Sequence, residues 1–279
     1  MERKIIKQVT GRRTTDGAGV KLVRVLSNET AKDFDPILML DSFDSVNPRD
    51  YQAGFPLHPH RGIETISYVY MGQMIHKDSL GNEDKIRDGE VQWMTAGSGI
   101  MHEERLPASK RLLGVQLWLN LAAKDKMVAP TYASIKADQI KEIVLPGGLL
   151  RVLAGSYEGE KGYQGKYQPL DYFDIHLDSY SSLTLKTDPH RSVMLFTLLG
   201  SIVVENVIVK EKTAVKLGEG DTLTIKTEAD RAQILFVSSV ALKEPVAWGG
   251  PIVMNTREEL YKAFQELDEG TFIKQRIKY

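Results

Sequence analysis

Two stretches of this sequence decide how the chain folds: Gly54-Phe55-Pro56-Leu57-His58-Pro59-His60-Arg61-Gly62-Ile63-Glu64-Thr65 and Ile100-Met101-His102-Glu103-Glu104. The first places His58 and His60 at positions i and i+2. The second does the same with His102 and Glu104. On an extended strand, residues i and i+2 project from the same face. Two such strands side by side would direct three imidazoles and one carboxylate to a single point, which predicts a metal site.

The sequence around these stretches predicts an all-β fold. Short segments rich in β-branched and aromatic residues follow one another, and most are separated by Gly, Pro, Asp or Asn. This spacing favours a sandwich or a barrel over βαβ units. The predicted strands are 21–26, 63–70, 91–94, 114–121, 149–153, 172–176, 182–186, 193–199, 202–209, 222–225 and 234–237.

Helix is scarce, and the best candidate lies near the C-terminus. Thr256 and Glu259 form a capping-box pattern, and Gly270 closes the segment. Leu260, Phe264 and Leu267 follow at i, i+4 and i+7. We expect a short helix that packs on a sheet.

The chain is long enough for two domains, and a weak internal repeat supports that division. A strand ends at Gly72 in the first half and at Gly200 in the second, and Gly89 and Gly220 each precede a later strand. Overlaying these glycines places Lys186, Asp188 and Gln233 opposite the three histidines, so only the first half has ligand residues. A boundary within 130–148 then gives a metal-binding domain over 1–135 and a domain without metal ligands over 136–279.

Composition excludes several classes of function. The chain is 42% hydrophobic and 26% charged with a net charge of −1, which is typical of a globular protein and argues against direct binding to nucleic acid. It has no cysteine, so thiolate ligands and a catalytic thiol are excluded. The first residues contain no apolar core of signal-peptide length, and no run is long enough to span a membrane. We expect a cytoplasmic protein.

The two stretches resemble the signature sequences of the pirins, which are two-domain members of the cupin superfamily. The resemblance extends to Asp35–Asp41, Gly114–Asn120 and Trp248–Pro251 and so covers both halves of the chain. It implies two tandem cupin-type jelly-roll β-barrels. It also implies that one metal is held in the first barrel by His58, His60, His102 and Glu104.

Glu64 is the residue whose role is open. The general cupin pattern takes its glutamate ligand from this position, whereas the pirin pattern takes it from the second motif. On a regular strand Glu64 shares a face with His60 and could serve as a base beside the metal. If Gly62 introduces a bulge, Glu64 would instead pair with a cation. The candidate catalytic residues are therefore Glu104 and Glu64, while Arg61 is expected to form a structural ion pair.

The ligand set indicates one divalent transition metal, because imidazoles with a carboxylate suit Fe, Zn, Mn, Ni, Cu or Co better than Ca or Mg. The resemblance favours iron. Some pirins act as quercetin 2,3-dioxygenases, which open a flavonol with O2 and release carbon monoxide. Other pirins are metal- and redox-responsive regulators that bind protein partners. The sequence is therefore compatible with an enzyme for a small aromatic substrate, with a regulatory protein, or with a purely structural metal.

Overall fold

The computed structural model describes residues 1–275, which form β-strands, short 3-10 helices and one α-helix. Contacts group the chain into two compact units. The histidine unit contains Arg13–Arg24, Ile37–Ala137 and the chain from Leu242 onward. The second unit contains Met1–Arg12, Val25–Pro36 and Asp138–Ala241. The first twelve residues therefore belong to the second unit, and the segment that begins at Leu242 belongs to the histidine unit. A single division at residues 135 and 136 does not describe this exchange. That division stays a proposal.

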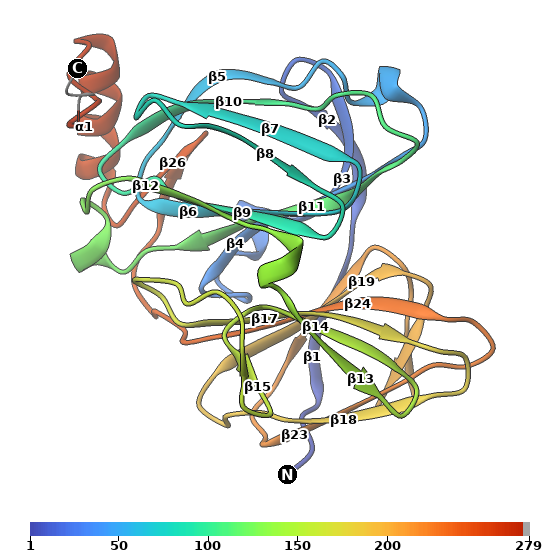
Figure 1. Cartoon of the computed structure of the whole chain (residues 1–279). Helices are drawn as coiled ribbons and strands as arrows, with labels where there is room; N and C mark the ends of the chain where they lie inside the picture. Colours follow the sequence, from blue (N-terminus) through green and yellow to red (C-terminus); the bar gives the residue numbers. More distant parts are fainter. Residues whose placement is uncertain (276–279) are drawn as a thin grey trace. The chain divides into compact units, whose positions relative to one another are not determined.

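The histidine unit is made of two antiparallel sheets, drawn as two layers in Figure 1. Buried apolar side chains of both sheets, among them Val69, Met74 and Ile86, form a core in this unit. The seven-stranded sheet has the order β12 (Thr131–Ile135), β9 (Glu90–Thr95), β6 (Ile63–Met71), β11 (Leu112–Asn120), β4 (Ile37–Ser45), β3 (Val20–Leu26) and β2 (Arg12–Asp16). The four-stranded sheet has the order β5 (Phe55–His60), β10 (Ile100–Arg105), β7 (Gln73–Asp78) and β8 (Glu83–Arg87).

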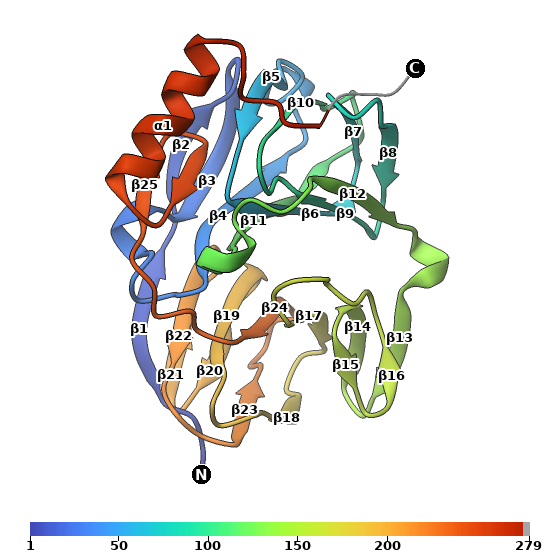
Figure 2. The ribbon, with the colours of Figure 1, turned by 90° about the vertical axis from the view of Figure 1, so that its left-hand side faces the viewer.

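The second unit repeats this plan, with its own seven- and four-stranded sheets (Figure 2). The larger sheet has the order β1 (Ile5–Thr10), β22 (Thr213–Leu217), β19 (Ser192–Leu199), β24 (Ala232–Ser239), β17 (Leu170–Leu177), β14 (Gly148–Ala154) and β13 (Lys141–Leu145). The smaller has the order β18 (Ser182–Lys186), β23 (Thr222–Lys226), β20 (Ile202–Val204) and β21 (Val207–Val209). A short hairpin joins β15 (Ser156–Tyr157) and β16 (Glu160–Lys161). The predicted all-β fold of two jelly-roll domains is confirmed, although in neither unit do the described strands close into a barrel.

The sheet orders correct the strand matching of the internal repeat. In the larger sheet of the histidine unit, β9 lies beside β6. In the larger sheet of the second unit, β19 corresponds to β6 and its neighbour is β22, so β9 corresponds to β22 and not to the strand that follows Gly220. That later strand, β23, lies in the smaller sheet and corresponds to β10, while β18 corresponds to β5. The strands that match the histidine strands therefore carry core side chains: Leu183, Leu185, Leu223 and Ile225.

The C-terminal segment of the chain packs in the histidine unit as the hairpin β25 (Ala247–Gly249) and β26 (Ile252–Met254), followed by α1 (Arg257–Asp268) (Figure 2). The predicted capping box is present, since the Thr256 side chain accepts from the Glu259 amide and the Glu259 carboxylate accepts from the Thr256 amide. Leu260 and Leu267 are partly buried against Ile252 and Met254. No helix of the described residues has the length and apolar character needed to cross a membrane.

Lys126 joins three parts of the histidine unit. Its buried ammonium group donates to the Gly62 carbonyl at 2.8 Å, to Asn120 Oδ1 at 2.7 Å and to the Val253 carbonyl at 3.0 Å. Burial lowers the pKa of Lys126 to about 8, and the charges of Glu244 and Glu259 oppose this shift. The lysine therefore links the β5–β6 turn and the end of β11 to the C-terminal hairpin.

Replacing Lys126 by Met is expected to destabilise the protein by about 3 kcal/mol, because the apolar chain retains its volume but leaves buried acceptors unpaired. This corresponds to a fall of roughly 6–12 °C in melting temperature, measured by calorimetry. Lys124→Met changes an exposed lysine of the same loop and serves as the control. Equal melting temperatures for the two variants would contradict the structural role.

Candidate metal centre

The two histidine-bearing strands are neighbours in the four-stranded sheet. Strands β5 and β10 pair antiparallel, with His102 opposite His58. Strand β5 is the edge strand of this sheet, where Pro56 and Pro59 are tolerated because a missing N–H does not interrupt the ladder. His58 and His60 nevertheless keep the shared face expected from their i, i+2 spacing, so the predicted juxtaposition of the two strands is present.

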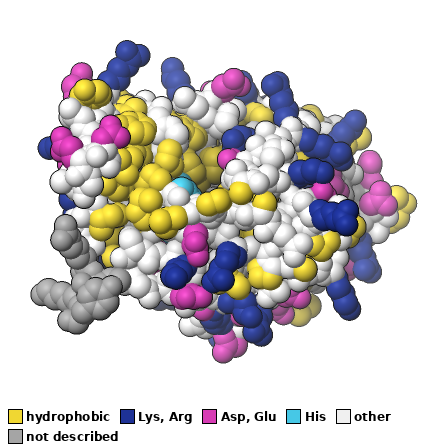
Figure 3. All heavy atoms as spheres, turned by 90° about the horizontal axis from the view of Figure 1, so that it is seen from above, with side chains coloured by type: hydrophobic (Ala, Val, Ile, Leu, Met, Phe, Trp, Pro, Cys, Tyr) yellow, Lys and Arg dark blue, Asp and Glu magenta, His cyan; other side chains and the backbone are white. Residues whose placement is uncertain are grey.

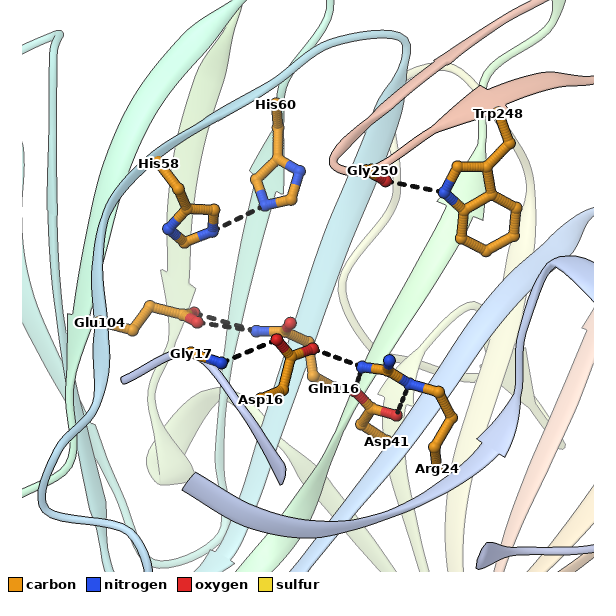
Figure 4. A network of polar contacts seen from close by, with 10 residues as sticks. All are labelled: Asp16, Gly17, Arg24, Asp41, His58, His60, Glu104, Gln116, Trp248 and Gly250. Carbon is orange, nitrogen blue, oxygen red and sulfur yellow. Dashed lines mark hydrogen bonds and ion pairs between the residues drawn. The ribbon is translucent and has the colours of Figure 1, made fainter. Parts of the chain in front are cut away.

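Three of the four predicted ligand residues come together. The candidate ligand atoms of His58, His60 and His102 lie within 4.8 Å of one another, and His58 Nε2 lies 3.0 Å from His60 Nε2 (Figure 4). The outer nitrogens face backbone carbonyls, with His58 Nδ1 at 2.8 Å from the Pro56 oxygen and His60 Nδ1 at 2.9 Å from the Pro251 oxygen. A carbonyl only accepts, so each Nδ1 carries a proton, and the Nε2 of a neutral ring then presents its lone pair inward.

These nitrogens fit a metal ion. Burial lowers the pKa of His60 to about 3, with a contribution from His58 and opposed by the Pro251 hydrogen bond. Burial, followed by the neighbouring histidines, lowers the pKa of His102 well below its usual value. His102 Nε2 is buried without a hydrogen-bond partner. Imidazole nitrogens that converge on one point are a donor set suited to a transition-metal ion.

Glu104, the fourth predicted ligand, lies inside the same unit but outside the three-histidine group. Its buried carboxylate accepts from Gln92 Nε2 at 2.5 Å and from Gln116 Nε2 at 2.9 and 3.1 Å. The register of β10 against β5 shifts between His102 and Glu104, so the two residues do not continue one regular pairing. Two amides therefore hold the carboxylate in a fixed orientation, as they would a metal ligand or a base.

Glu64, the other predicted catalytic residue, has a different environment. Glu64 Oε1 accepts from Thr95 Oγ1 at 2.7 Å, and no histidine of the cluster is among its partners. Glu64 and Ser67 are three residues apart on β6, so their side chains project from opposite faces of the strand. Gln116 donates both to the Ser67 hydroxyl and to Glu104, so Ser67 faces Glu104 and Glu64 faces away from it. Burial raises the pKa of Glu64, and hydrogen bonds from Thr95 and Trp93 oppose the rise. This placement gives no support to Glu64 as a base beside the metal.

The sequence reasoning overlooked Gln92, Gln116, His76 and Asp78, which are all buried beside the candidate ligands. His76 and Asp78 also stand at i, i+2 on one strand, the same signal that identified the histidine pairs. The sequence offers His76 no second histidine at this spacing, so His76 is not among the predicted ligands. Arg61 forms the expected structural contacts, donating to Glu266 at 2.7 Å and to the Ser98 carbonyl at 2.8 Å.

The wall of the site is aromatic on the side of the C-terminal hairpin. The ring of Trp118 lies 5.0 Å from that of His60, and the half-exposed Trp248 ring lies 5.7 Å from Trp118. Among the described histidines of this unit, His58 alone is not buried. Figure 3 shows a histidine exposed among clustered hydrophobic side chains. His58 is therefore the solvent-exposed edge of the histidine cluster.

A charged network lies below the histidines in Figure 4. Arg24 makes a bidentate contact with Asp41 at 2.9 and 2.7 Å and also donates to Asp16 at 2.6 Å. Burial tends to raise the pKa of Asp16, but the hydrogen bonds from Arg24 and the Gly17 amide, together with nearby positive charge, outweigh it and the pKa is lowered. Because two carboxylates neutralise the guanidinium, this arginine is not available to bind a substrate anion.

The fold and this site define a class of protein. Two jelly-roll units of matching strand order, one of them with a histidine cluster on adjacent strands of its smaller sheet, make the chain a bicupin. The pirin family model matches residues 19–119, and the model of the pirin C-terminal cupin domain matches residues 172–273.

Similarity to known proteins extends over the whole chain. A pirin-like protein of Caulobacter vibrioides is 41% identical over 274 residues, which cover 97% of this chain and 99% of the relative. The chain belongs to the pirin family. The crystal structure of a quercetin 2,3-dioxygenase from Acinetobacter baumannii has a TM-score of 0.90 at 32% identity, covering 98% of this chain and 99% of that chain. A bacterial pirin from Escherichia coli in complex with nickel(II) has a TM-score of 0.66 at 20% identity, covering 84% and 98%.

Proposed function

We propose that this pirin is a metal-dependent dioxygenase that opens flavonols such as quercetin with O2. The observation that carries the proposal is the convergence of three imidazoles, among which the buried His102 Nε2 has no hydrogen-bond partner within residues 1–275. The likeness to a quercetin 2,3-dioxygenase structure supports the choice of substrate. We propose His58, His60 and His102 as ligands, with Glu104 as the fourth.

Iron is the metal that we propose, and nickel is the first alternative because a bacterial pirin binds nickel(II). Both ions accept imidazole and carboxylate ligands. When bound, the metal would supply a Lewis acid that lowers the pKa of a flavonol hydroxyl group.

The chain's own residues would orient the substrate and take its proton. Trp118 packs against His60, and the half-exposed Trp248 beside it offers an aromatic face on which a flat flavonol can stack. Glu104 accepts from two glutamine amides, which hold its carboxylate in a fixed orientation, and it would accept the hydroxyl proton as a general base.

A metal-responsive regulatory role is the second candidate, and one contact favours it. The Pro251 carbonyl faces His60 Nδ1, so a change in the metal's charge would act directly on the C-terminal segment. Tyr261 and Phe264 of α1 are exposed at 66% and 38% and could contact a protein partner. In this role the metal would alter the surface of α1 without turnover.

The deciding experiment measures metal content, binds a flavonol without oxygen and then adds a pulse of O2. Wild-type protein is expected to consume the flavonol and release carbon monoxide, while the His58→Ala/His102→Ala variant retains neither metal nor activity. Stoichiometric metal without consumption of any of several flavonols would contradict the dioxygenase. A metal-dependent change in hydrogen exchange at α1 would then support the regulatory role.

A further inference from the structure

Two buried residues, His76 and Asp78, lie behind His102 of the candidate metal centre. His76 Nδ1 lies 3.4 Å from His102 Nδ1, and His76 Nε2 lies 2.9 Å from Asp78 Oδ2. Both side chains belong to β7, which pairs with β10 so that Asp78 is opposite His102. The three side chains form a chain of contacts that starts at the nitrogen of His102 pointing away from the cluster.

The hydrogen-bond partners of Asp78 decide which atom donates and which accepts in each of these contacts. Its Oδ1 accepts from the backbone amides of Leu80 and Asn82, and its Oδ2 accepts from the Asn82 side-chain amide. Four donors, counting His76, hold Asp78 as an acceptor, so His76 Nε2 carries a proton. With Nε2–H directed at Asp78, the Nδ1 of His76 is placed to accept from His102 Nδ1–H. This leaves the lone pair of His102 on Nε2, facing the cluster.

The ring of His76 is also held in place. It stacks on Tyr132 with ring centroids 4.2 Å apart and an angle of 14° between the planes. His58 and His60 rely on backbone carbonyls for the same orientation, which no side-chain substitution removes. His102 alone depends on a side chain, and substitution can therefore test this dependence.

We propose that His76 and Asp78 are positioning residues that fix the tautomer and the ring orientation of His102 as a metal ligand. This inference rests on the proposed metal centre. Hydrogen-bonded groups behind a ligating histidine raise its basicity, and removing them weakens metal affinity about 10- to 100-fold. His76 touches no substrate and acts only through His102.

The test compares the full-length apoprotein of wild type, His76→Phe and His76→Gln in titrations with Ni(II) and Co(II). Phenylalanine keeps the stacking on Tyr132 but offers no acceptor, so affinity is expected to fall about 10- to 100-fold and the Co(II) absorption spectrum to change. Glutamine restores an acceptor oxygen and is expected to recover most of the affinity. Asp78→Asn should show a loss in the same direction. His190→Phe, in the second unit, is the control.

Several results would overturn the inference. If His76→Phe binds Co(II) as tightly as wild type, with the same spectrum, then the positioning role is wrong while the metal centre stands. If both His76 variants lose affinity equally and their melting temperatures fall together, the role is merely structural. A wild-type protein that binds neither ion overturns the proposed metal centre and this inference with it.

Discussion

Ending the chain at Val246, before β25, is expected to abolish metal binding although every candidate ligand remains in the protein. The removed segment buries Ile252, Val253, Met254 and Phe272 in the histidine unit. At about 1.5–3 kcal/mol for each buried side chain, the loss is roughly 6–12 kcal/mol. A domain is stabilised by only about 5–15 kcal/mol in total, so the histidine unit should lose its fixed structure.

The measurement combines Ni(II) titration with two-dimensional NMR. We expect the dispersed signals of the histidine unit to collapse while those of the second unit persist, because the second unit contains no part of the removed segment. Tyr261→Ser, which changes a side chain of α1 that is 66% exposed, is the control and should bind normally. A truncated protein with wild-type affinity for Ni(II) would show that the C-terminal segment is dispensable.

Glu104→Gln is expected to lower flavonol turnover about 10²- to 10⁴-fold, the usual contribution of a general base. The amide keeps the shape of the side chain but cannot take up a proton. Its NH2 group is a donor and replaces one of the two carboxylate oxygens that accept from Gln92 and Gln116. Single-turnover kinetics after an oxygen pulse give the rate, and elemental analysis gives the metal content. Since three imidazoles remain, we expect the metal to stay bound.

Glu64→Gln provides the matched comparison. This substitution also neutralises a buried carboxyl group, but one whose partner is Thr95 rather than the candidate centre. Burial already raises the pKa of Glu64 towards the neutral form that glutamine imitates. Turnover should therefore change less than about twofold. An equal loss in both variants would return Glu64 to the list of candidate bases.

Features with a local cause could be predicted from the sequence. The shared face of His58 and His60 follows from the two-residue period of a strand, and pairing with β10 needs only one neighbouring strand. The helix α1 follows from Thr256 and Glu259, whose reciprocal hydrogen bonds span three residues. Such patterns are complete within a few residues and need no knowledge of the rest of the fold.

Features that depend on distant pairing could not be predicted. The spacing of the glycines matches β9 with β23, although the two strands lie in different kinds of sheet. The turn sequence before a strand is similar whichever sheet the strand joins, so it does not identify the pairing partner. The sheet face on which Glu64 lies could not be predicted either, because Gly62 has a φ of +78° and interrupts the strand between His60 and Glu64. Nothing in Ile252–Met254 reveals that this segment packs in the histidine unit.

The carbonyl of Pro251 has a consequence for how the protein is made. It is separated by 191 residues from His60, the histidine that it orients. At a synthesis rate of roughly 5–20 residues per second, it follows the histidine after roughly 10–40 s. The three candidate ligands thus emerge from the ribosome long before their surroundings are complete. If the three histidines bind a metal as proposed, we expect stable binding only after Pro251 has been synthesised and its carbonyl has reached His60.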